Sequence, residues 1–244
     1  MLKTDSSKVP LRAHVPDSLK HLLRRVKSAL MDSYATKSYS QEGEDMILRR
    51  VLGNTSQGFY VDVGAHHPKR FSNTYYYYKC GWNGINIDAM PGNMALFDRC
   101  RQRDTNLEMG VSNKEEDVEF YMFEEPALNT FDKKTAIEYE QAGAKVIATQ
   151  LVRTFPLKDI LKRYMPAGRV IDFMSVDVEG LDYQVLESND WELFRPRFVL
   201  VEALDFDIEA LQNNEMYAYI RRQGYRLFSK TLNTILFRDA RISK

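Results

Sequence analysis

Carboxylate side chains stand at the ends of three short apolar segments, where they could bind a ligand or accept a proton. Asp62 lies at the end of the first segment, Asp88 ends the second, and Asp177 and Glu179 follow the third. An acid at the offset of Asp88 can hold the two hydroxyls of a ribose. An acid next to a reacting hydroxyl can take its proton. The pattern favours a site for a nucleoside-like ligand with a proton acceptor beside it.

The loop that follows Asp62 restricts the choice of nucleoside. It contains a single glycine, and its residues are Gly64, Ala65, His66, His67 and Pro68. It lacks the G-x-G-x-x-G pattern that places a pyrophosphate on a helix N-terminus, and it lacks the lysine pattern of a P-loop. S-adenosylmethionine has a ribose and an adenine but no phosphate, and its positive charges suit nearby carboxylates. The loop therefore favours S-adenosylmethionine and argues against a dehydrogenase that uses a nicotinamide cofactor.

These acids belong to a chain in which apolar strands and helical segments alternate. We expect the core strands at residues 58–64, 84–88, 107–111, 169–178 and 198–202, and two further strands at residues 118–123 and 144–153. Such alternation predicts an α/β fold, with a mostly parallel, doubly wound central sheet and helices on both faces. A C-terminal antiparallel hairpin is expected at residues 225–228 and 234–237. Ligands of such sheets bind beyond the carboxyl ends of the strands, which is where the four acids lie.

The overall composition describes a packed globular protein without a net charge. Hydrophobic residues make up 44% of the 244 residues, and 34 lysines and arginines balance 34 aspartates and glutamates. This balance of charges argues against a nucleic-acid partner, which would need a basic field.

The sequence shows no targeting or membrane segment. No run of apolar residues approaches the roughly 20 residues of a membrane-spanning helix, and we see no signal peptide. With only two cysteines, Cys80 and Cys100, we expect a cytoplasmic protein with reduced thiols.

The first 37 residues differ from the rest in charge, because they contain eight lysines and arginines against three aspartates. Residues 17–33 predict an amphipathic helix, since apolar residues recur at helical spacing and most basic residues lie off that stripe. We therefore divide the chain into a basic extension, residues 1–37, and a single Rossmann-like domain, residues 38–244. The helix would either pack on this domain or present its basic face to an anionic lipid or glycolipid surface. The sequence leaves the oligomeric state open.

Five short motifs stand in a fixed order along the chain. They are Ser38-Tyr39-Ser40-Gln41-Glu42-Gly43-Glu44-Asp45, Tyr60-Val61-Asp62-Val63-Gly64-Ala65-His66-His67-Pro68, Ser72-Asn73-Thr74-Tyr75, Gly81-Trp82-Asn83-Gly84-Ile85-Asn86-Ile87-Asp88-Ala89 and Ser175-Val176-Asp177-Val178-Glu179-Gly180-Leu181-Asp182. In order and spacing the chain resembles the FkbM-type family of S-adenosylmethionine-dependent methyltransferases, from about residue 38 to residue 237. The resemblance implies a Rossmann-like class I methyltransferase fold and O-methylation of a hydroxyl on a sugar, glycan or glycosylated natural product. Many family members carry Asn where this chain has His66.

The resemblance also implies roles for individual residues in these motifs. Gln41 and Asp45 would border the cofactor site. Asp62 and Gly64 would face the methionine part of the cofactor, and Asp88 would face its ribose. The residues expected to bind the cofactor are Gln41, Asp45, Asp62, Gly64, Ala65, His66, Asn73, Thr74, Asp88, Ala89 and Asp177.

Methyl transfer to a hydroxyl needs an aligned acceptor and a group that takes its proton. The candidate bases are Glu179, Asp177 and His67, and the resemblance places the first two at the transferring methyl. We favour Glu179, because Asp177 is expected to hold the cofactor or orient its neighbour. Histidines beside carboxylates could bind a metal ion, but no spaced ligand motif supports one, so we predict no metal. The alternative function is a catalytically silent protein that binds the cofactor or docks on a membrane as a partner in glycan assembly.

Simpler structural roles stay open for several of these residues. The acids after the third apolar segment could cap the next helix, and His66 and His67 could be turn residues bonded to the backbone. Asn73 and Thr74 could cap a helix rather than touch a ligand. Residues 124–135 leave the regular pattern, so they form either a lid over the acceptor or a surface loop.

Overall fold

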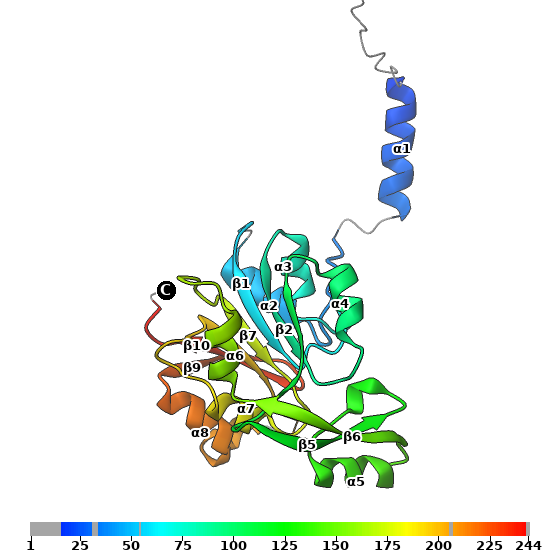
Figure 1. Cartoon of the computed structure of the whole chain (residues 1–244). Coiled ribbons are helices and arrows are strands. Elements are labelled where there is room, and N and C mark those ends of the chain that lie inside the picture. The colour runs from blue at the N-terminus through cyan, green and yellow to red at the C-terminus, as the bar shows by residue number, and fades with distance from the viewer. Residues whose placement is uncertain (1–15, 31–33, 54, 205–206, 243–244) are drawn as a thin grey trace, which may run out of the picture. The chain divides into compact units, whose positions relative to one another are not determined.

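The computed structural model describes residues 16–30, 34–53, 55–204 and 207–242, which belong to two units (Figure 1). The first unit, Met1–Lys37, contains helix α1 (Asp17–Leu30). Residues 31–33 of the predicted helix lie outside the described residues. The second unit, Ser38–Lys244, contains the remaining helices and strands. Among the described residues, no helix combines the length and the apolar character needed to cross a membrane.

A seven-stranded sheet forms the centre of the second unit, in the order β3-β2-β1-β7-β8-β10-β9. Its strands are β1 (Phe59–Val63), β2 (Asn83–Asp88), β3 (Thr105–Glu108), β7 (Phe173–Val176), β8 (Phe198–Glu202), β9 (Tyr225–Lys230) and β10 (Thr234–Asp239). The first five of these pair in parallel, whereas β10 pairs antiparallel with both β8 and β9. The mostly parallel sheet and the C-terminal antiparallel hairpin predicted from the sequence are confirmed.

The strand order reverses between β1 and β7. β1 pairs with β2 on one side and with β7 on the other, so that Val63 lies opposite both Ile87 and Val176. All three strands end at one edge of the sheet, and the loops that follow them lie together. Ligands of open α/β sheets bind at such a switch point.

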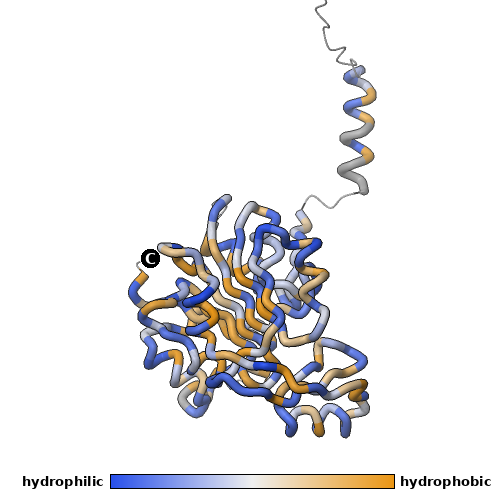
Figure 2. The backbone as a smooth tube through the Cα atoms, viewed as in Figure 1, coloured by the Kyte–Doolittle hydropathy of each residue, from blue (hydrophilic) through white to orange (hydrophobic). Residues whose placement is uncertain are grey.

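Helices cover both faces of the sheet, because successive side chains of a strand point to opposite faces. The helices of this unit are α2 (Glu44–Leu52), α3 (Tyr75–Lys79), α4 (Met94–Cys100), α5 (Lys133–Gln141), α6 (Leu157–Tyr164), α7 (Asp182–Glu187) and α8 (Glu215–Arg222), with short 3-10 turns η1 (Pro126–Leu128) and η2 (Ile208–Asn213). Residues of α2 and α3 pack with Tyr60 and Phe173 in one apolar layer. Residues of α6, α7 and α8 pack with Val61 and Met174 in the other. Figure 2 shows the apolar band that these strands form between the helices.

A second, three-stranded sheet of order β4-β6-β5 extends the predicted fold. Its strands are β4 (Gly110–Val111), β5 (Glu116–Phe123) and β6 (Val146–Phe155). The single strand expected at residues 107–111 is wrong, because the chain leaves the central sheet after β3. Gly110 lies so close to β6 that an added Cβ would sit 2.7 Å from the Thr154 methyl group. We refer to residues 116–155 as the β5–β6 arm. It includes α5, which Asp132 caps by accepting two backbone N–H groups.

Candidate active site

A cavity opens beyond the carboxyl ends of β1, β2 and β7. Its empty space, with the open mouth included, is about 940 Å³. Most predicted site residues line it, namely Gln41, Asp62, Gly64, Ala65, His66, Asn73, Asp88, Ala89, Asp177 and Glu179. The β5–β6 arm supplies a further part of the wall, with Phe120, Pro126, Ala127, Asn129 and Phe131. The segment 124–135 therefore borders the cavity.

Two predicted cofactor residues lie behind this lining rather than in it. Asp45 is fully buried at the start of α2, where it accepts hydrogen bonds from the Ser38 hydroxyl at 2.6 Å and the Tyr39 N–H at 3.0 Å. Thr74 is also fully buried, and its hydroxyl donates to the carboxylate of Asp62 at 2.8 Å. Both side chains hold neighbouring segments in place.

His67, one of the three candidate bases, also lies outside the lining. Its Nδ1 accepts hydrogen bonds from the backbone N–H groups of Lys69 and Arg70, at 3.0 and 2.9 Å. This is the turn-forming role left open by the sequence. His66 does line the cavity, and burial lowers the pKa of its imidazole. Glu179 and Asp177 are the candidate bases on the cavity wall.

The carboxylate of Asp88 is held rigidly at the end of β2. One oxygen accepts the Met90 N–H and the other accepts the His66 N–H, both at 2.8 Å. Burial raises the pKa of Asp88, and these two N–H groups oppose the rise. Each carboxylate oxygen has more than one lone pair, so the remaining ones can accept hydrogen bonds from a ligand. A pair of ribose hydroxyls is the donor set that suits this arrangement.

Asp62 and Asn73 offer acceptors to a positively charged group. Asp62 is buried, which raises its pKa to about 6, while the hydrogen bond from Thr74 acts in the opposite direction. The Asn73 amide donates to the Ser175 hydroxyl at 3.0 Å, and its Oδ1 has no hydrogen-bond partner among the described residues. A buried acceptor without a partner is costly, and an ammonium group in the cavity would satisfy it. These residues therefore fit the amino group of a methionine moiety.

Gly64 allows the loops after β1 and β7 to approach each other. Its backbone has a φ of +79°, and an added Cβ would lie 1.6 Å from the carbonyl oxygen of Asp177. No other residue type fits without moving one of the two loops. Gly64 therefore brings the cofactor loop, which we define as residues 64–68 after β1, against the segment that carries the candidate bases Asp177 and Glu179.

Three carboxylates gather at the ends of β7 and β8. One oxygen each from Asp177, Glu179 and Glu202 lies within 4.8 Å of the other two. Burial raises the pKa of Glu179 to about 7, and burial with the nearby Glu179 charge raises that of Glu202 to about 8. The pKa of Asp177 is also raised, first by burial and then by Glu202. A carboxylate with a pKa near 7 suits a general base at neutral pH.

The predicted site does not include Glu202, although the pattern that indicates the other acids applies to it as well. It is the last residue of β8, in the apolar run 198–202. Asp62, Asp88 and Asp177 are predicted site residues because they lie at the ends of predicted strands. The same criterion applied to the fifth strand indicates Glu202.

The β5–β6 arm fixes the conformation of Glu179. The Tyr139 hydroxyl, on α5, donates to the Glu179 carboxylate at 2.9 Å, and the Thr130 hydroxyl donates to the Glu179 carbonyl oxygen. Glu179 itself has a φ of +51°, which is uncommon outside glycine. An added Cβ on Gly180 would lie 3.1 Å from Asp132, so the arm packs closely over this turn. No sequence motif indicated these contacts.

Replacing Tyr139 with phenylalanine is expected to raise the pKa of Glu179 further above its ordinary value. The phenol hydrogen bond stabilises the ionised carboxylate, so its loss favours the protonated form. Hydrogen bonds to charged groups contribute about 1.5–3 kcal/mol, which corresponds to a rise of about one pH unit or more. The measurement is an NMR titration of protein labelled at the glutamate carboxyl carbons, with Glu179 assigned from a Glu179→Gln variant.

The matched control for this titration is Tyr121→Phe. The Tyr121 hydroxyl donates to Glu119 at 2.7 Å, on the exposed side of β5. This variant should leave the Glu179 titration unchanged. An unchanged titration in Tyr139→Phe as well would show that the hydrogen bond does not control the ionisation of Glu179.

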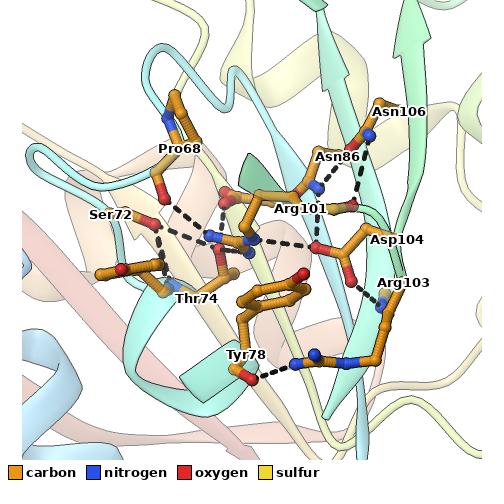
Figure 3. Close-up of polar contacts among 12 residues, drawn as sticks. Pro68, Ser72, Thr74, Tyr78, Asn86, Arg101, Arg103, Asp104 and Asn106 are labelled. Atoms are coloured by element: carbon orange, nitrogen blue, oxygen red, sulfur yellow. Dashed lines mark hydrogen bonds and ion pairs between the residues drawn. The ribbon is translucent and has the colours of Figure 1, made fainter. Parts of the chain in front are cut away.

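A buried arginine ties together the segments behind Asp62 (Figure 3). Arg101 has no exposed surface and pairs with Asp104 at 2.9 Å. Its guanidinium also donates to the Pro68 carbonyl at 2.9 Å and to the Thr74 hydroxyl at 2.8 Å. Because Thr74 donates in turn to Asp62, Arg101 connects the cofactor loop, the start of α3 and a cavity carboxylate. No sequence motif indicated this role either.

The arrangement of the site can be compared with known protein families. A family model described as the methyltransferase FkbM domain matches residues 62–227, which is more than half of the chain. The chain belongs to this family. The match confirms the predicted family and, with it, S-adenosylmethionine as the cofactor.

Solved structures of other methyltransferases resemble this FkbM methyltransferase at low sequence identity. A methyltransferase FkbM from Methylobacillus flagellatus KT is 16% identical with a TM-score of 0.49, and the match covers 82% of this chain and 48% of that one. This chain thus spans about half the length of that structure. An O-methyltransferase from Bacillus cereus, in complex with SAH, is 10% identical over 93% and 92% of the two chains, with a TM-score of 0.37. A 1,6-didemethyltoxoflavin-N1-methyltransferase from Burkholderia thailandensis is 13% identical over 96% and 93%, with a TM-score of 0.41. No curated protein matches the chain significantly.

Proposed function

We propose that this FkbM methyltransferase transfers a methyl group from S-adenosylmethionine to a hydroxyl of a sugar, glycan or glycosylated natural product. The observation that carries the proposal is the position of Glu179. Its carboxylate lines the same cavity as Asp88, Asp62 and Asn73 and has a pKa of about 7. A proton acceptor beside a nucleoside site suits methylation of a hydroxyl, which must lose its proton.

The residues of the cavity would divide the cofactor between them. Asp88 would hold the ribose hydroxyls, while Asp62 and the Asn73 amide oxygen would hold the amino group of the methionine part. Bound there, S-adenosylmethionine would supply an activated methyl group. Asp177 would lie between the cofactor and the acceptor, since it lines the cavity and its carboxylate neighbours Glu179.

Glu179 would act on the acceptor. Its ionised carboxylate would accept the proton of the acceptor hydroxyl, and Tyr139 would keep the carboxylate oriented while it holds that proton. The cluster can carry a proton near neutral pH because burial raises the pKa values of Glu179 and Glu202. The presence of this base supports an enzyme over a catalytically silent cofactor-binding protein.

We also propose that the protein is located in the cytoplasm. The free thiols of Cys80 and Cys100 support this proposal.

The cofactor assignment of the cavity is tested by calorimetric titration with S-adenosylhomocysteine, with NADH as the comparison ligand. We expect micromolar binding of S-adenosylhomocysteine and none of NADH. Asp88→Ala should weaken S-adenosylhomocysteine binding about tenfold or more, because it removes the charged acceptor of hydrogen bonds that the ribose hydroxyls donate.

The control for this titration is Asp159→Ala, which removes an exposed carboxylate in the first turn of α6, away from the cavity lining. Its affinity should match that of the unmodified protein. Equal affinity in Asp88→Ala, or preference for NADH, would contradict the placement of the cofactor in this cavity.

A further inference from the structure

Within the first unit taken by itself, helix α1 carries an exposed apolar stripe. The exposed fractions of Leu19, Leu22 and Val26 are 45%, 57% and 45%. The three residues are spaced by three and four positions, so they lie on one face of the helix. A helix face of this kind is stable when something apolar covers it.

The charge of α1 indicates what kind of surface would cover this stripe. The helix sequence contains four basic residues, Lys20, Arg24, Arg25 and Lys27, against one acid, Asp17. The whole chain has 34 basic and 34 acidic residues, so the excess of positive charge is local. An anionic surface that also accepts apolar side chains would match both properties.

We propose that α1 lies flat in the surface of an anionic lipid bilayer, with Leu19, Leu22 and Val26 towards the acyl chains. Interfacial helices combine an apolar face with a basic polar face, and this is the composition of α1. Its 14 residues are too few to span a bilayer, which agrees with a helix lying parallel to the surface. Lys20 and Arg25 would contact the headgroups, where attraction to anionic lipids falls off within a Debye length.

The test is co-sedimentation of the full chain with phosphatidylcholine vesicles that either contain or lack phosphatidylserine. We expect binding to the vesicles with phosphatidylserine, weakened by high salt, and little binding to phosphatidylcholine alone. Leu22→Ser should weaken binding about tenfold or more, because the leucine would no longer enter the apolar layer. Lys20→Gln combined with Arg25→Gln should weaken it about 25-fold, from roughly fivefold for each basic residue removed.

A charge-matched control keeps these results interpretable. Lys158→Gln combined with Lys162→Gln removes two exposed lysines from α6 and should leave vesicle binding unchanged. Equal losses in the α1 and α6 pairs would show that total charge, rather than the helix, drives binding. The proposal is overturned if the chain does not sediment with anionic vesicles. It is also overturned if Leu22→Ser binds them normally, or if duplex DNA competes fully with the vesicles, because the partner would then be a generic polyanion.

Discussion

Replacing Glu179 with glutamine is expected to lower kcat by about 10²–10⁴-fold, while the Kd for S-adenosylhomocysteine stays within about twofold. Glutamine keeps the size of the side chain but cannot take the proton of the acceptor hydroxyl. It can still accept the hydrogen bond from Tyr139, so the turn should keep its conformation. The measurement is transfer of labelled methyl groups into a panel of glycans, followed by kinetics of the variant on the best acceptor.

The matched control for this experiment is Glu187→Gln, which changes an exposed glutamate at the end of α7. It should retain full turnover. In the unmodified protein, Glu179 must be ionised to act, and its pKa is about 7. The rate should therefore rise with pH through about 7 and fall as the pH drops below it. Full activity in Glu179→Gln would remove this residue from the reaction.

Replacing Arg101 with leucine is expected to destabilise the protein by about 3–5 kcal/mol, because it leaves the buried Asp104 carboxylate without its cationic partner. The substitution also removes the hydrogen bonds to Pro68 and Thr74. The measurement is the free energy of unfolding in urea. The loop after β1 should loosen as well, so binding of S-adenosylhomocysteine should weaken in the fraction that remains folded.

Two further variants separate the contributions of Arg101. Arg99→Leu changes an exposed arginine on α4 and should shift the unfolding free energy by no more than about 0.5 kcal/mol. Thr74→Val keeps the ion pair but breaks the connection to Asp62, and should cost about 1 kcal/mol. If Arg101→Leu unfolds at the same urea concentration as the unmodified protein, the buried ion pair does not support the fold.

The central sheet could be predicted because its strands are buried on both faces and end in recognisable acids. The runs that became β1, β2, β7 and β8 are continuous apolar segments, a pattern that buried parallel strands produce. The carboxyl ends of such strands meet at one edge, so the sequence alone places Asp62, Asp88 and Asp177 together. Most predicted site residues do line one cavity.

The strands of the β5–β6 arm could be predicted, but their arrangement could not. The strands expected at residues 118–123 and 144–153 are confirmed as β5 and β6. Their pairing in a separate sheet and the helix α5 between them were not predicted, because α5 buries little besides Ala136 and so has a weak apolar pattern. Contacts such as Tyr139 to Glu179 join residues far apart in the chain, and local patterns carry no information about them.

Sequence motifs also do not distinguish a side chain that faces a ligand from one that supports it. Asp45 and Thr74 are examples, because both belong to the motifs yet lie behind the cavity wall.

The two sides of the pocket come from separate stretches of the gene. The acids assigned to the cofactor follow strands of the central sheet, whereas Phe120, Asn129 and Phe131 on the opposite wall, and the partner of Glu179, come from residues 116–155. Under the proposed function, shuffling that cassette between members of the family would exchange the acceptor-binding half of the pocket while the cofactor-binding half stays intact. Directed evolution of new acceptor specificities should begin with that cassette.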